Sequence, residues 1–169
     1  MAKFKMHPFI STMANMLIIF GLVTYATKGV SFGAIDPAIP NIFIPKAGRF
    51  PMIILWAIIA VVVVWFIWNK TTFGKNLYAV GGNPEASTVS GISVFKVTMG
   101  AFIMAGVLYG FGSWLECLRM VGSGSAAYGQ GWDMDAIAAC VVGGVSFTGG
   151  IGKISGVVTG VLIFTSLTY

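Results

Sequence analysis

Charged residues are scarce in this chain of 169 residues. They make up 9% of it, whereas a soluble globular domain carries about 25%. With a hydrophobic share of 57% and a mean hydropathy of +0.90, the chain has too few polar groups to cover a folded surface in water. A soluble enzyme and a secreted module are therefore excluded. Because a membrane-spanning helix needs about 20 apolar residues, the length allows about five spans.

Histidine and cysteine are nearly missing. His7 is the only histidine, which argues against a histidine-based metal site and a Ser-His or Cys-His catalytic pair. Cys117 and Cys140 lie in apolar or glycine-rich sequence with no second Cys or His at ligand spacing. We expect buried free thiols, with a disulfide as the alternative.

Acidic residues are also few, five against ten Lys and Arg, and the basic residues stand at the ends of apolar runs. This placement is typical of membrane topology signals and does not indicate a nucleic-acid-binding surface. The runs without charge predict an all-α, polytopic transmembrane bundle in a single membrane-spanning domain, with segments at 8–27, 52–68, 97–115, 136–148 and 154–169. The last run has 16 residues, which is short for a span. We therefore expect the sequence to be a piece of a longer membrane protein.

The orientation of the chain follows from lysine and arginine. The loop at 69–96 carries Lys70, Lys75 and Lys96 but only one acid, Glu85, and this excess predicts a cytoplasmic location. The loop at 28–50 then falls outside, although its three basic residues oppose that assignment.

Residues that favour helix ends predict a short helix over 84–90 within the loop at 69–96. Asn83 suits the N-cap, Pro84 the first helical position, and Glu85 the positive end of the helix dipole. Gly91 suits the residue that ends the helix. The plainer alternative is a capped surface helix that only joins two spans.

Several motifs together resemble one family. They are Phe73-Gly74-Lys75-Asn76, Gly81-Gly82-Asn83-Pro84-Glu85-Ala86, Ser90-Gly91-Ile92, Asp135-Ala136-Ile137-Ala138-Ala139, Val142-Gly143-Gly144 and Gly149-Gly150-Ile151-Gly152. The sequence resembles bacterial ABC-type sugar importer permeases of the ribose, xylose and galactose branch, and it is most similar to those for galactose and methyl galactoside. The resemblance covers nearly the whole chain and matches the C-terminal half of the family pattern.

The resemblance implies a multi-pass permease subunit in the bacterial inner membrane that imports a monosaccharide, galactose or methyl galactoside above all. Its implied partners are a cytoplasmic ABC ATPase, a periplasmic sugar-binding protein, a second permease copy in a homodimer, and membrane lipid. It implies no catalytic residues and no cofactor, because ATP hydrolysis belongs to the partner. The residues expected to form the ATPase-coupling loop are Gly82, Asn83, Pro84, Glu85, Ala86, Ser90 and Gly91.

Two further groups of residues are candidates for function. Gly152, Gly156 and Gly160 recur every four residues, which favours close helix packing, with a dimer contact or pore lining as alternatives. The second group consists of charged and aromatic residues expected at the outer mouth of the pathway, where they would bind sugar hydroxyls: Glu116, Arg119, Tyr128, Trp132, Asp133 and Asp135. As the plainer alternative, the four charged members are boundary residues and helix caps.

Other transport classes stay open at this point. Within ABC permeases, ribose, xylose, autoinducer and branched-chain amino acid substrates are alternatives. An ion-coupled secondary transporter is less favoured, because such a mechanism uses ionisable groups deep in the spans and the charges here cluster at span ends. A scaffold that transports nothing is a further alternative.

Overall fold

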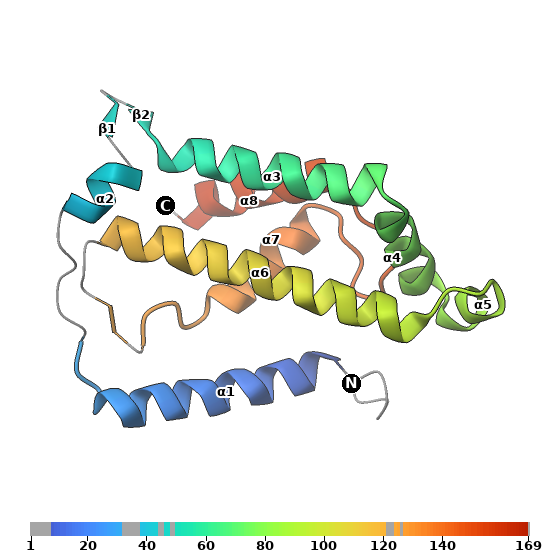
Figure 1. Ribbon diagram of the computed structural model, residues 1–169, viewed down its shortest axis with the longest axis horizontal. Helices are drawn as coiled ribbons and strands as arrows, with labels where there is room; N and C mark the ends of the chain where they lie inside the picture. Colours follow the sequence, from blue (N-terminus) through green and yellow to red (C-terminus); the bar gives the residue numbers. More distant parts are fainter. Residues whose placement is uncertain are drawn as a thin grey trace. The chain divides into compact units, whose positions relative to one another are not determined.

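The computed structural model describes residues 8–31, 38–43, 46–47, 50–120, 124–125 and 127–168, and most of these residues are helical (Figure 1). The elements are α1 (Pro8–Thr27), α2 (Ala38–Phe43), β1 (Lys46–Ala47), β2 (Phe50–Pro51), α3 (Ile53–Lys70), α4 (Thr72–Gly82), α5 (Pro84–Val89), α6 (Val94–Met120), α7 (Trp132–Val142) and α8 (Ile154–Thr168). The expected all-α fold is confirmed. The antiparallel pair β1–β2, in which Ala47 lies opposite Phe50, was not expected from the sequence.

Three helices are long and apolar enough to cross a membrane: Phe9–Thr27 in α1, Ile53–Lys70 in α3 and Val94–Met120 in α6. A helix suits this environment because it satisfies its backbone hydrogen bonds internally. At about 1.5 Å per residue, the 18 residues of α3 extend about 27 Å, close to the hydrocarbon thickness of a bilayer. The helix α8 is apolar but shorter, with 15 residues.

Two helices differ from the charge-free segments. The helix α6 continues past 97–115 at both ends, because Lys96, Glu116 and Arg119 are compatible with a helix even where hydrocarbon ends. The helix α7 begins at Trp132 and ends at Val142, so the second half of the expected segment 136–148 is not helical. The pair Gly143-Gly144 stops this helix although no charge follows until Lys153.

The chain forms two compact units, residues 1–57 with 102–128 and residues 58–101 with 129–169. An aromatic cluster organises the described part of the first unit. Phe43 and Trp114 pack edge to face with ring centroids 5.3 Å apart, and Trp56 lies 6.1 Å from both Trp114 and Phe111. The Trp56 indole also donates a hydrogen bond of 3.2 Å to the carbonyl of Phe43. The cluster thereby joins α2, the start of α3, and α6.

Glycine contacts join α7 and α8 in the second unit. A methyl group added at Gly156 would overlap the carbonyl oxygen of Gly143, and one added at Gly160 would overlap the carbonyl oxygen of Ala139. The two backbones therefore touch, as helices do where small residues face each other. Gly152, the third member of the repeat, precedes α8 and lies against the side chain of Val145.

Both cysteines are free thiols. The expectation that both are buried is wrong for Cys117, which is exposed on α6, whereas Cys140 on α7 is half-buried. The reason is that in lipid the hydrophobic effect does not drive apolar side chains of a spanning helix inward.

Replacing Gly156 with Leu should separate α7 from α8 and lower the thermal unfolding midpoint. Forcing a larger side chain into a tight contact typically costs about 1–3 kcal/mol. The matched control is Gly106→Leu, because an added methyl group at Gly106 meets nothing within 4 Å. Unfolding in detergent of both variants checks the prediction, and an unchanged midpoint for Gly156→Leu would contradict it.

Candidate functional site

A sharp turn connects the spanning helix α3 to α4. Thr71 is the N-cap of α4: its hydroxyl accepts a hydrogen bond of 3.3 Å from the backbone N–H of Gly74 and donates one of 2.5 Å to the carbonyl of Ile67. A methyl group at Gly74 would lie only 2.7 Å from the Cα of Trp68, so only glycine fits this turn. The backbone at the start of α4 therefore lies directly against the end of α3.

Asn83 separates α4 from α5 and serves both helices. Its backbone N–H continues α4 with a bond of 3.0 Å to the carbonyl of Ala79, and its side-chain oxygen accepts a bond of 3.0 Å from the N–H of Ala86. Pro84 occupies the first turn of α5, as expected from the sequence, and Glu85 lies in the same turn. Asn83 is thus both the C-cap of α4 and the N-cap of α5.

The C-terminal end of α5 also closes as expected. Gly91 has φ +80°, a conformation that favours glycine, and its N–H donates to the carbonyl of Thr88 at 3.0 Å. The N–H of Ile92 donates to the carbonyl of Ser87 at 2.9 Å, which completes a glycine stop. The helix itself ends at Val89, with Ser90 as its C-cap.

The surface of α5 is exposed on most sides. Ser87 is buried and donates a hydrogen bond of 2.8 Å to the carbonyl of Asn83. Glu85 is exposed, and Val89 is 91% exposed. A six-residue helix with its ends closed and its remaining surface uncovered is well suited to contact a partner.

The helix α4 was not predicted from the sequence. A signal for it was present: Thr71 is a good N-cap, and Phe73, Leu77 and Val80 follow at helical spacing. The loop expected at 69–96 therefore consists largely of two capped helices.

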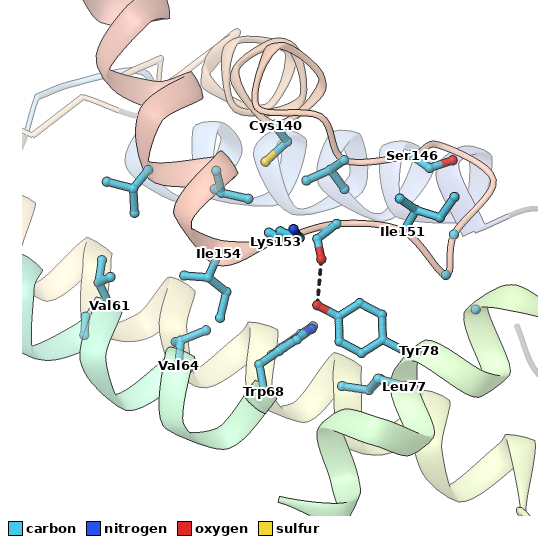
Figure 2. Close-up of a pocket in the computed structure, with 18 residues that line it drawn as sticks. Val61, Val64, Trp68, Leu77, Tyr78, Cys140, Ser146, Ile151, Lys153 and Ile154 are labelled. Atoms are coloured by element: carbon cyan, nitrogen blue, oxygen red, sulfur yellow. Dashed lines mark hydrogen bonds between the residues drawn. The ribbon is translucent and has the colours of Figure 1, made fainter. Parts of the chain in front are cut away.

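A cavity of about 540 Å³ lies beside α4 in the second unit. Figure 2 shows Val64 and Trp68 of α3 across from Tyr78 of α4 and from Ile154 at the start of α8. The Tyr78 hydroxyl donates a hydrogen bond of 2.7 Å to the carbonyl of Gly152, drawn as the dashed line in Figure 2. The walls are mainly apolar, so the cavity offers few polar groups to a polar ligand.

Three of the expected outer-mouth residues come together in the first unit. Arg119 Nε donates to both carboxylate oxygens of Glu116 at 3.0 Å, and Arg119 Nη2 forms an ion pair with Glu116 Oε1. Arg119 Nη2 also donates to the Tyr128 hydroxyl at 3.1 Å, and that hydroxyl donates to Glu116 Oε1 at 2.6 Å. The bond to this carboxylate raises the pKa of Tyr128, because deprotonation would place two negative charges side by side.

The other three expected residues belong to the second unit. Trp132, Asp133 and Asp135 lie in the first turns of α7, and both carboxylates stand where the helix dipole favours negative charge. The described residues contain no group of three or more His, Cys, Asp or Glu side chains placed to hold a metal ion.

The sequence matches over residues 1–168 a family described as the permease component of branched-chain amino acid transport systems. The chain belongs to this family. It is accordingly a multi-pass protein of the bacterial inner membrane, with several apolar helices in the described part.

The chain is similar to several sugar permeases. The galactose/methyl galactoside import permease of Treponema pallidum is 54% identical over 99% of this chain and 33% of its own length. Its Escherichia coli counterpart is 44% identical over 99% of this chain and 52% of its own length. The L-arabinose transport permease of Escherichia coli is 35% identical, over 96% of this chain and 49% of its own length. The chain thus spans between a third and about half of these relatives, and no solved structure matches it.

The network of Glu116, Arg119 and Tyr128 leads to a prediction for this permease. Glu116→Ala removes the partner that both other side chains share, so the turn at Tyr128 should open more often. The N–H of Tyr128, which donates to the carbonyl of Ser125 at 3.0 Å, should then exchange its hydrogen several-fold faster. Hydrogen exchange measured by mass spectrometry checks this. Tyr109→Ala is the control, since Tyr109 is 75% exposed on the same helix, and equal exchange in both variants would contradict the prediction.

Proposed function

We propose that this chain is part of the membrane-spanning permease subunit of an ATP-driven ABC importer for a monosaccharide, with galactose or methyl galactoside as the favoured substrate. The observation that carries this proposal is the 54% identity, over nearly the whole chain, to a galactose/methyl galactoside import permease. The chain itself is not the enzyme: a partner ATPase hydrolyses ATP, a periplasmic binding protein delivers the sugar, and a second permease copy completes the pathway.

In this proposal α5 is the helix that docks on the ATPase. Three features support it: the helix is mostly exposed, its two ends are capped, and in the sequence it comes between the spanning helices α3 and α6. An isolated helix of six residues is not stable in water, so its caps and its attachment to α4 must hold it in shape. A rigid element of this kind can pass a nucleotide-driven movement to the spans.

The network at the end of α6 is proposed to face the outer mouth of the pathway. Since α6 begins at Val94, within the segment 69–96 that the lysine pattern predicts to be cytoplasmic, its C-terminal end belongs on the outer side. There the carboxylate of Glu116 and the guanidinium of Arg119 would bind sugar hydroxyls, with Tyr128 between them.

Other small solutes remain the alternative to galactose within the same mechanism. The relatives include permeases named for L-arabinose, xylose and ribose, and the family description names branched-chain amino acids. Uptake of radiolabelled galactose in competition with unlabelled pentoses and leucine separates these substrates. Uptake of radiolabelled leucine by a preparation that takes up no radiolabelled galactose or pentose would overturn the sugar proposal.

Charge reversal at Glu85 tests the docking role of α5. Glu85→Arg should reduce recovery of the ATPase with the permease while leaving membrane insertion normal. The direct effect of the new charge on the helix dipole is only about 0.3–1 kcal/mol. A loss of ATPase larger than about fivefold would therefore exceed that term and has to come from the interface. The measurement is co-purification of the ATPase with the permease from membranes.

The matched control is Thr72→Arg. Thr72 is exposed in the first turn of α4, so arginine there opposes a helix dipole in the same way without touching α5. Recovery of the ATPase should stay normal in this variant. Normal recovery with Glu85→Arg as well, together with intact sugar-stimulated ATP hydrolysis, would show that α5 only joins two spans.

A further inference from the structure

Two glycine pairs from distant parts of the sequence meet backbone to backbone in the second unit. Gly81 and Gly82 end α4, while Gly149 and Gly150 form the turn between α7 and α8. A methyl group on Gly81 would lie 2.7 Å from the backbone nitrogen of Gly150, and one on Gly149 would lie 2.7 Å from the carbonyl oxygen of Gly81. We call these four residues the glycine clasp. No side chain fits at its centre.

The α7–α8 side of the clasp has its own internal support. Gly149 and Gly150 have φ values of +91° and +72°, which other residues rarely adopt. The N–H of Ser146 donates to the carbonyl of Ile151 at 3.0 Å, which closes the turn, and the Ser146 hydroxyl bonds to that of Thr148 at 2.7 Å. The turn therefore presents a fixed backbone surface to α4.

Tyr78 makes a second attachment about one turn earlier on α4. Its hydroxyl reaches the carbonyl of Gly152, next to the clasp (Figure 2). After Gly152 the chain enters α8, whose Gly156 and Gly160 touch the backbone of α7. Backbone contacts thus run from α4 to the turn and on through both helices of the α7–α8 hairpin.

The side of the hairpin that faces α3 is different. There the 540 Å³ cavity separates Ile154 and Val157 of α8 from Val61 and Val64 of α3. The hairpin is therefore attached to α4 by close backbone contact and a hydrogen bond, and it has room next to α3. Packed backbone contacts resist sliding, whereas a cavity leaves space for a rigid-body shift.

We propose that the glycine clasp and Tyr78 couple α5 to the α7–α8 hairpin, so that α4, α5 and the hairpin move as one body when the ATPase moves α5. The inference rests on the proposed docking of α5, and it adds the route by which movement enters the membrane. Tyr78 and the clasp glycines act here as positioning residues.

The first test is Gly81→Ala in the permease assembled with its ATPase and sugar-binding protein in liposomes. The added methyl group should force the clasp apart while α5 keeps its caps and its docking surface. We expect normal recovery of the ATPase but about tenfold less sugar imported per ATP hydrolysed, a loss within the range typical of coupling between two sites. Gly106→Ala is the control, because its methyl group meets nothing within 4 Å.

This measurement separates the two proposals. Failure of the docking proposal appears as normal ATPase recovery with Glu85→Arg. Failure of the clasp proposal appears as an unchanged ratio of sugar to ATP with Gly81→Ala, in a complex that contains the normal amount of ATPase.

A second measurement decides the matter even where Gly81→Ala prevents assembly. Spin labels are placed on Lys75→Cys in α4 and Leu162→Cys in α8, both exposed positions, after Cys117 and Cys140 have been replaced by Ala. Labelled permease is diluted with unlabelled copies so that pairs within one chain dominate. We expect one narrow distance that is the same without nucleotide and with ATP.

The comparison pair is Val62→Cys in α3 with Leu162→Cys, which spans the cavity side of the hairpin and should change its distance with ATP. A change in the Lys75–Leu162 distance would show that the clasp opens during the cycle and would overturn the proposal. A constant distance in both pairs would also overturn it, because the hairpin would then not move at all.

Discussion

Close approach of two backbones at glycine is the contact on which the second unit depends. In a bilayer, moving an apolar side chain from lipid into a helix interface gives no hydrophobic free energy, because both surroundings are apolar. Helices are therefore held together by tight packing and polar contacts. Gly156 and Gly160 provide that packing between α7 and α8, and Gly74 provides it between α4 and the end of α3. Gly81 and Gly149 provide it between α4 and the hairpin turn. A methyl group at any of these five positions would meet backbone atoms, and backbone cannot rearrange as a side chain can.

The parts of the candidate site that could be predicted are those that depend on neighbours in sequence. The caps of α5 involve bonds between residues three to five apart, and Asn83, Pro84 and Gly91 signal them directly. The pairing of Glu116 with Arg119 on one helix face is likewise local. The addition of Tyr128 to that pair depends on the path of the chain after α6, which no spacing rule describes.

The positions of charged residues did not predict where α6 and α7 end. Lys96 and Glu116 limit the apolar part of α6, yet the helix runs past both because charged side chains at a membrane surface still favour helix. In α7 the helix is shorter than the charge-free run, since Gly143 ends it within sequence that carries no charge. The contact of Gly81 with Gly150 and the aromatic cluster around Trp56 are long-range features, so they emerge only in the folded structure.

Asn83 caps both α4 and α5, and this limits insertions and deletions in the segment. Because α5 starts at the residue where α4 stops, no flexible linker is present to absorb a change in length. One residue inserted within α4 would turn everything after it by about 100° and advance it by about 1.5 Å. Glu85 and Val89 would then face a different side, and Gly81 would no longer meet the turn at Gly150. The number of residues between Gly74 and Asn83 is therefore under stricter constraint than the identity of the exposed side chains among them.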